Sequence, residues 1–237
     1  MLLIDAGNSR IKWAVVKDGQ WLWQGAVEHT ANALQTAFTG LPPPHKILVS
    51  NVAGEAAAQR ICAACAAWPC APEFIVSEAE RCGVRNGYAR PAQLGSDRWA
   101  ALIAAWHQLH AACIVVNCGT ATTVDALSDK GEFIGGLILP GVDMMQRSLM
   151  TGTAQLGAGD GHWCEFPRNT ADALFSGAIQ ATVGAVHQQH ALLAVPGARC
   201  LLSGGAAGKV VPHLGLPVEQ AKNLVLQGLW IMGQGEQ

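Results

Sequence analysis

The chain has 237 residues, of which 50% are hydrophobic and 14% charged, with a formal net charge of -2 and no dense run of Lys or Arg. This length allows one large or two small domains, and the charge balance argues against nucleic-acid binding. Neither a secretory signal nor an apolar run long enough for a membrane helix is visible, so we expect a soluble, cytoplasmic protein without a membrane partner. The low charged fraction indicates that a partner covers apolar surface, most simply in a homodimer.

The chain opens with a predicted strand, a tight turn and a second strand. Residues 2–4 form a short apolar run typical of a buried strand, and residues 13–16 form the second strand. Gly7 permits the turn between them, and a further turn at residues 18–19 leads to a third strand. Helices and strands then alternate. The predicted elements are helix 31–38, strand 46–52, helix 55–68, strand 73–76 and helix 97–110.

An internal repeat starts the second half of the chain. Residues 2–9 align with residues 114–121, because each segment is an apolar run, an Asp or Asn, a small residue, and a glycine before small polar residues. The alignment continues without a gap to Gly19 and Gly131. The elements predicted here are strands from residue 113, at 124–127 and at 136–139, helices at 144–151 and 169–190, a strand at 199–202 and a closing helix at 220–232. We therefore expect an α/β protein of two similar halves, 1–112 and 113–237, with a ligand cleft between them.

Three turns are candidates for binding phosphate. They follow predicted strands at residues 5–9, 117–123 and 203–208, where glycines and small polar residues present backbone N–H groups and hydroxyls. The sequence contains neither a P-loop nor a dinucleotide-binding glycine motif, so a nucleotide needs another arrangement. Asp5, at a strand end, can hold a hydrated Mg²⁺, and Lys12 either approaches phosphate or points to solvent.

Several segments together resemble type III pantothenate kinases. Asp5-Ala6-Gly7-Asn8-Ser9-Arg10-Ile11-Lys12 is similar to the family's opening motif, D-x-G-N-[TS]-x-x-K. The segments similar to later family motifs are Tyr88 and Pro91 with Leu94-Gly95-Ser96-Asp97-Arg98-Trp99, Asn117-Cys118-Gly119-Thr120-Ala121-Thr122-Thr123-Val124-Asp125, Gly135-Gly136-Leu137-Ile138-Leu139-Pro140-Gly141, Asn169-Thr170 and Ser203-Gly204-Gly205. The resemblance covers essentially the whole chain, and the combination of motifs is specific.

The resemblance implies a fold and a reaction. The fold is that of the actin-like ATPases, with duplicated ribonuclease H-like halves, each a mixed sheet flanked by helices. The reaction transfers the γ-phosphoryl group of ATP to the primary hydroxyl of pantothenate, which is the first step of coenzyme A synthesis. The family is also expected to form homodimers with the pantothenate pocket near the subunit interface.

The resemblance also implies roles at the pantothenate site. Asp97 resembles the general base that accepts the proton of the substrate hydroxyl, although a first-turn acid of the predicted helix is the plainer interpretation. Arg98 would anchor the carboxylate of pantothenate, where the alternative is a surface ion pair. The other residues implied to contact pantothenate are Tyr88, Gly95, Ser96, Asp97 itself and Thr170.

ATP is the nucleotide that the resemblance implies, together with two kinds of metal ion. The residues expected around its phosphates are Asp5, Ala6, Gly7, Asn8, Ser9, Arg10, Ile11, Lys12 and Thr120. Mg²⁺ would be held by Asp5 through water. Asn117 stands where the family has an aspartate that coordinates a monovalent cation. Its amide oxygen can ligate K⁺ or NH₄⁺ but brings no charge, so this cation stays a hypothesis.

Two other functions remain open from the sequence. One is a kinase of the same superfold that acts on another small hydroxylated substrate, although sugar kinases of this fold usually carry larger insertions. The other is a regulatory accessory protein that binds nucleotide without turning over pantothenate. Asp5, Lys12, Asp97 and Arg98 favour the enzyme, because a regulator has no need of all four.

Overall fold

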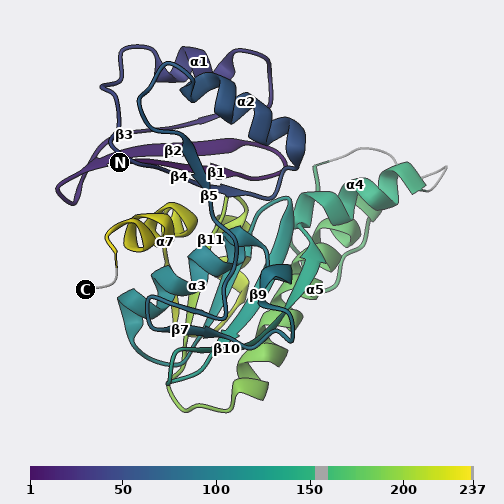
Figure 1. Ribbon diagram of the computed structural model, residues 1–237. Coiled ribbons are helices and arrows are strands. Elements are labelled where there is room, and N and C mark those ends of the chain that lie inside the picture. Colours follow the sequence, from purple (N-terminus) through teal and green to yellow (C-terminus); the bar gives the residue numbers. More distant parts are fainter. Residues whose placement is uncertain (153–159, 236–237) are drawn as a thin grey trace. The chain divides into compact units, whose positions relative to one another are not determined.

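A computed structural model describes residues 1–152 and 160–235 of the chain. The chain forms two compact units (Figure 1). Unit 1 consists of Met1–Gln108 together with the chain from Asn223 onward, and unit 2 is Leu109–Lys222. The expected halves, 1–112 and 113–237, differ from these units in one element, because the last helix belongs to unit 1.

Unit 1 is built on a five-stranded sheet with strand order β3-β2-β1-β4-β5. The strands are β1 (Leu2–Ala6), β2 (Ile11–Lys17), β3 (Gln20–Val27), β4 (Ile47–Asn51) and β5 (Pro72–Phe74). The first three strands are antiparallel, and β1, β4 and β5 run parallel to one another. Since alternate residues of a strand point to opposite faces, Leu2 and Ile4 enter one buried cluster, while Leu3 and Asp5 share the other face.

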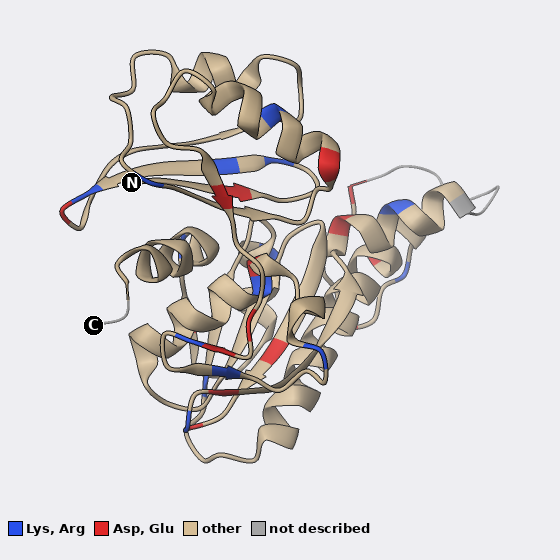
Figure 2. Cartoon of the chain, in the orientation of Figure 1, with Lys and Arg blue, Asp and Glu red and all other residues tan. Residues whose placement is uncertain are grey.

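Helices cover both faces of this sheet. On one face, α1 (Ala33–Phe38) and α2 (Glu55–Cys65) pack together, and Phe38 and Ile61 join the cluster of Leu2 and Ile4. On the other face lies α7 (Leu224–Gly233), which carries no charged residue (Figure 2) and contacts β1 and β4. The elements that complete unit 1 are the strands β6 (Glu80–Arg81) and β7 (Val84–Asn86), the short 3₁₀-helix η1 (Pro91–Gln93) and the helix α3 (Ser96–Leu109).

Unit 2 repeats the strand order of unit 1 as β10-β9-β8-β11-β12. The strands are β8 (Cys113–Cys118), β9 (Ala121–Leu127), β10 (Glu132–Pro140), β11 (Arg199–Ser203) and β12 (Val218–Gln220). The helices are α4 (Val142–Gly152), α5 (Thr170–Leu193), α6 (Ala207–Val210) and the 3₁₀-helix η2 (Val211–His213). Alternate residues of β8 pack under α5, so that Asn117 lies on the opposite face. Among the helices of the described residues, none is both long and apolar enough to cross a bilayer.

A β-bulge supports the duplication, because it occurs at the same place in both units. In unit 1 the register of β2 and β3 skips Leu22, and in unit 2 the register of β9 and β10 skips Ile134. These two residues are equivalent in the sequence alignment of the halves. The repeat therefore extends beyond the strand order to a local irregularity of the backbone.

The structure corrects two details of the sequence prediction. The repeat is not free of gaps: Asp5 pairs with Lys12, but its equivalent Asn117 pairs with Thr123, so the second unit's first turn is one residue shorter. The turn after β9 is one residue longer and restores the alignment. The closing helix begins at Leu224 rather than at residue 220, because Gln220 ends a strand that pairs with Leu202.

Candidate functional site

Asp5 and Lys12 face each other at the end of the first hairpin of unit 1. Asp5 pairs in register with Lys12 on β2 and with Ser50 on β4, which places all three side chains on one face of the sheet. Loss of solvent raises the pKa of Asp5 to about 7, the charge of Lys12 opposes this rise, and the nearby carboxylate of Asp97 adds to it. A carboxyl group in this setting is stabilised in its charged form by any cation that approaches it.

The turn after Asp5 is closed by one backbone hydrogen bond. The Gly7 N–H donates to the Arg10 carbonyl at 3.2 Å, while Asn8, Ser9 and Arg10 are exposed. Ala6 and Ile11 are buried in the core, so of the residues predicted around the phosphates these two can offer only backbone groups. The turn therefore presents backbone N–H groups and small polar side chains to the surface.

Asp97 lies in the first turn of α3, with space made for it by Gly95. Its Oδ1 accepts the Arg98 backbone N–H at 2.8 Å. A Cβ atom on Gly95 would lie 2.6 Å from the same Oδ1, so any side chain at this position would displace the carboxylate. Burial raises the pKa of Asp97, and the hydrogen bond and the charge of Arg98 oppose the rise. Both interpretations of Asp97 from the sequence remain compatible with this placement.

A pair of buried hydroxyls fixes the start of α3 beside Asp5. The Oγ atoms of Ser96 and Ser50 lie 2.9 Å apart, and both side chains are buried. Ser50 is the strand neighbour of Asp5, which explains why Asp97 influences the pKa of Asp5. Ser50 was not predicted from the sequence, because its role depends on the pairing of β4 with β1, which no local pattern shows.

Arg98 and Tyr88 form a contact within unit 1. The Arg98 guanidinium is buried, its Nη1 donates to the Tyr88 hydroxyl at 3.0 Å, and its Cζ lies 5.7 Å from the centre of the tyrosine ring. This arrangement excludes the surface ion pair considered for Arg98. A buried, planar set of N–H donors next to a hydroxyl is suited to recognising a carboxylate.

In unit 2 the corresponding turn, Gly119–Thr120, is enclosed by backbone. The Gly141 N–H donates to the Thr120 carbonyl at 2.9 Å, and the Ala206 N–H donates to the Cys118 carbonyl at 3.0 Å. A Cβ atom on Gly141 would lie 2.2 Å from the Gly119 carbonyl oxygen, and one on Gly204 2.3 Å from that of Cys118. Both glycines are therefore required by close backbone packing, which fixes the shape of the turn.

Asn117 lies one residue before the end of β8, between two hydroxyl-bearing neighbours. It pairs with Thr123 on β9 and with Ser203 on β11, so three neutral oxygen-bearing side chains share one face of the sheet. The described residues contain no group of three or more His, Cys, Asp or Glu side chains that could hold a metal ion. A cation held by these three side chains would have neutral ligands.

Thr170 is the first residue of α5, but it does not cap the helix. The cap is Asn169, whose side chain accepts the Asp172 N–H at 2.9 Å. Thr170 is exposed and lines a mostly apolar groove of about 550 Å³ between α4 and α5. The other residues of this groove are Met145, Ser148, Leu149, Ala173, Leu174, Gly177 and Ala178.

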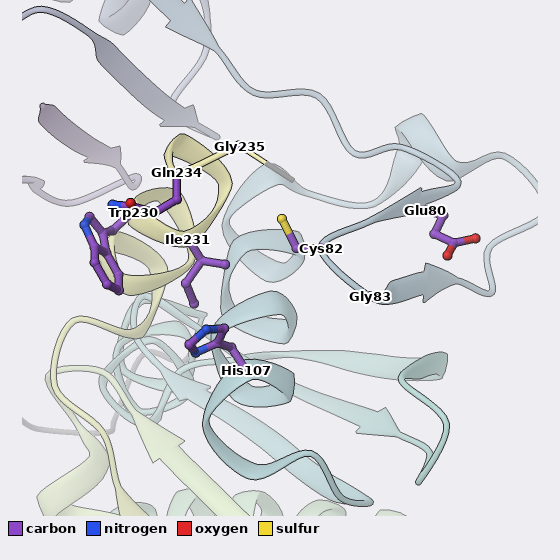
Figure 3. A pocket seen from close by; sticks show the side chains of 8 residues that line it. All are labelled: Glu80, Cys82, Gly83, His107, Trp230, Ile231, Gln234 and Gly235. Carbon is purple, nitrogen blue, oxygen red and sulfur yellow. The ribbon is translucent and has the colours of Figure 1, made fainter. Parts of the chain in front are cut away.

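A larger cavity of about 640 Å³ in unit 1 contains none of the predicted site residues. Figure 3 shows its lining, with His107 from α3, Trp230 and Ile231 from α7, Gln234 just after that helix, and the hairpin of Glu80, Cys82 and Gly83. Its lining mixes one imidazole, one carboxylate and one indole. This set lacks the two carboxylates and the lysine that lie near one another at Asp5, Asp97 and Lys12.

The fold is that of the actin-like ATPases and sugar kinases, as solved structures show. A protein from Campylobacter jejuni described as a Baf family transcriptional activator matches with a TM-score of 0.63 at 20% identity, over 99% of this chain and 98% of that one. A protein from Sinorhizobium meliloti described as a 2-dehydro-3-deoxygalactonokinase matches with a TM-score of 0.55 at 13% identity, over 98% of each chain. At these identities the likeness shows the fold alone.

Sequence comparison identifies the family within this class. A profile of type III pantothenate kinase matches residues 1–191. The type III pantothenate kinase of Aromatoleum aromaticum is 49% identical over 99% of this chain and 98% of its own, and that of Nitrosospira multiformis is 46% identical over 97% and 89%. The chain belongs to the type III pantothenate kinase family.

Proposed function

We propose that the protein transfers the γ-phosphoryl group of ATP to the primary hydroxyl of pantothenate, the first step of coenzyme A synthesis. Its family and the kinase fold support this activity. The observation that carries it is the carboxylate of Asp97, held at the start of α3 in the space left by Gly95 and within electrostatic reach of Asp5. This is the arrangement expected of a base beside a phosphate-binding turn.

Asp97 would orient the substrate hydroxyl and accept its proton. Phosphoryl transfer depends mostly on positioning and charge neutralisation, so a carboxylate that holds the hydroxyl in line makes a large contribution. The raised pKa of Asp97 makes it a better proton acceptor than an exposed aspartate. Arg98 and Tyr88 would hold the carboxylate of pantothenate, and Ser96 would fix the helix that carries both Asp97 and Arg98.

The nucleotide phosphates would contact the turn of residues 7–10 and the side chain of Lys12. Thr120, in the corresponding turn of unit 2, stays a candidate phosphate ligand. Asp5 fits a hydrated Mg²⁺, because its desolvated carboxylate is stabilised by a nearby cation. When bound, Mg²⁺ would neutralise charge on the phosphates. Lys12 adds a second positive charge on the same face of the sheet.

Asn117 is the candidate ligand for K⁺ or NH₄⁺. Its neighbours Thr123 and Ser203 add hydroxyl oxygens, which can also ligate a monovalent cation. We keep a homodimer and a cytoplasmic location as parts of the proposal. The low charged fraction of 14% supports the dimer.

The decisive assay measures pantothenate-dependent ADP release, with phosphopantothenate identified as the product. The parent chain should turn over with Mg²⁺ in K⁺ or NH₄⁺ buffer, and Asp97→Asn should lose roughly 10²–10⁴-fold in kcat because the proton acceptor is removed. Asp18→Asn is the matched control, since Asp18 is exposed in the β2–β3 turn and Asn accepts its positive φ of 49°.

Four results of this assay would change the assignment or the mechanism. ATP binding without pantothenate turnover by the parent would favour a regulator, and turnover of another small alcohol would favour a different kinase. Full activity of Asp97→Asn would remove the base from the mechanism. A rate that is unchanged when Na⁺ replaces both K⁺ and NH₄⁺ would remove the monovalent cation.

A further inference from the structure

A histidine outside the predicted site contacts the phosphate-binding turn of unit 1. The Nε2 atom of His29, in the loop after β3, lies 2.7 Å from the Gly7 carbonyl oxygen. On its other side, Nδ1 of His29 lies 3.2 Å from Nη2 of Arg60, which belongs to α2. The turn that follows Asp5 is thus connected through one imidazole to the helix on the far face of the sheet.

The two partners of His29 define which of its two ring nitrogens carries the proton. A guanidinium has only donors, so the Nδ1 atom must accept from Arg60 with its lone pair. A carbonyl oxygen only accepts, so the Nε2 atom must carry the proton that it donates to Gly7. Both contacts are satisfied by the neutral imidazole with its proton on Nε2. Arg60 therefore selects the tautomer that can bind the turn.

This hydrogen bond also fixes the direction of the next backbone N–H. In a trans peptide the C=O and the N–H point in opposite directions, so holding the Gly7 carbonyl toward His29 turns the Asn8 N–H away from it. Asn8 is exposed at the tip of the turn. A glycine peptide in a turn rotates easily, and without His29 the Gly7–Asn8 peptide has less to hold it in one orientation.

We infer that His29 is a positioning residue for nucleotide binding, and that Arg60 acts through it. The pair holds the Gly7–Asn8 peptide so that the Asn8 N–H is available to a phosphate oxygen of the bound nucleotide. The inference rests on the proposed function in one respect, the placement of the nucleotide phosphates at this turn. Neither residue is among the predicted ligands of pantothenate, so their effect should appear in nucleotide affinity and not in the affinity for pantothenate.

The test measures binding of Mg·ADP by calorimetry, without pantothenate, and then KM for ATP, KM for pantothenate and kcat. His29→Ala should weaken ADP binding and raise KM for ATP by roughly three- to tenfold, the range expected for one lost hydrogen bond. KM for pantothenate should stay unchanged. His29→Gln should recover most of the affinity, because its amide can donate to Gly7 and accept from Arg60.

Arg60→Ala should have a smaller effect than His29→Ala, and the double variant should be no worse than His29→Ala alone, because Arg60 acts through the imidazole. His45→Ala is the matched control, as His45 is an exposed histidine in a loop of the same unit. Should His29→Ala fail to fold, the comparison of His29→Gln with Arg60→Ala decides the matter, with the loss expected only in the second.

Parent-like ADP binding by His29→Ala, an equal rise of both KM values, or failure of His29→Gln to restore affinity would each overturn the inference. A parent that binds ADP but does not phosphorylate pantothenate would contradict the proposed function and leave this inference intact. Absence of ADP binding by the parent would contradict both.

Discussion

At the scale of single residues, Asp5 has an environment that costs stability when no cation is bound. Its carboxyl has a pKa raised to about 7, whereas its unfolded value is 3.8, mainly because the folded chain removes it from water. The folded state therefore binds a proton more tightly than the unfolded state. The contribution of Asp5 to the free energy of unfolding is therefore fully present below the unfolded pKa of 3.8, and it is lost as the pH rises through the folded pKa of about 7.

Asp5→Asn should reverse this loss in the free protein. The variant keeps the shape of the side chain but has no charge to desolvate, so its melting temperature should match the parent at about pH 4 and exceed it by a few degrees at about pH 8. Thermal unfolding followed by circular dichroism at both pH values measures the difference. A difference that does not change with pH would mean that the Asp5 carboxylate is well solvated in the folded state.

At the scale of secondary-structure elements, a glycine sets how closely two helices of unit 1 approach. A Cβ atom on Gly228 of α7 would lie 1.9 Å from the Ala100 carbonyl oxygen of α3. Both atoms belong to rigid parts of helices, so the clash could be relieved only by moving one helix. Gly228→Ala should therefore lower the free energy of unfolding by about 1–3 kcal/mol, as overpacking does in other cores.

Gly184 in α5 provides the matched control for this change. It lies inside a helix, and a Cβ atom placed on it has open space around it. Gly184→Ala should raise the free energy of unfolding by about 0.5–1 kcal/mol, because alanine loses less backbone entropy. Urea denaturation of both variants measures the change in the free energy of unfolding and its direction in each case. Equal effects from both would show that α7 can move away from α3 at little cost.

Long elements with clear patterns could be predicted from the sequence, and short elements that depend on partners could not. The apolar runs of β1 and β8 and the Ala-rich α2 were expected at nearly their observed positions. The strands β6 and β12 have only two and three residues, too few to show any periodicity. They exist because neighbouring strands offer backbone groups to pair with.

The same distinction separates the predicted site residues from those that were missed. Asp5 and Asp97 were predicted because a motif of chain neighbours marks them. His29 and Ser50 were not, since each acts on a residue more than twenty positions away that only the folded sheet brings near. Gly95 was expected to contact pantothenate, which stays a prediction, and the structure shows a separate constraint at this position, the Asp97 carboxylate beside it.

At the scale of the whole molecule, the units differ in how much apolar surface they leave exposed. Most of the large exposed apolar side chains among the described residues belong to unit 2. They are Ile134, Leu137, Ile138, Met144, Leu149, Trp163, Phe166 and Leu192. The groove between α4 and α5, which Leu149 and Thr170 line, lies in the same unit. If the chain forms a homodimer, unit 2 is accordingly the favoured surface.

A charge introduced into this groove should separate the dimer. Light scattering should give the parent about twice the mass of one 24.8 kDa chain, and Leu149→Glu should shift it toward one chain, because a buried, unpaired carboxylate is costly. Leu22→Glu is the matched control in unit 1, since Leu22 and Leu149 are 42% and 49% exposed.

A monomeric parent would contradict the dimer, and dissociation by Leu22→Glu alone would move the interface to β3. If Leu149→Glu also raises KM for pantothenate while KM for ATP holds, dimerisation and the pantothenate site are coupled.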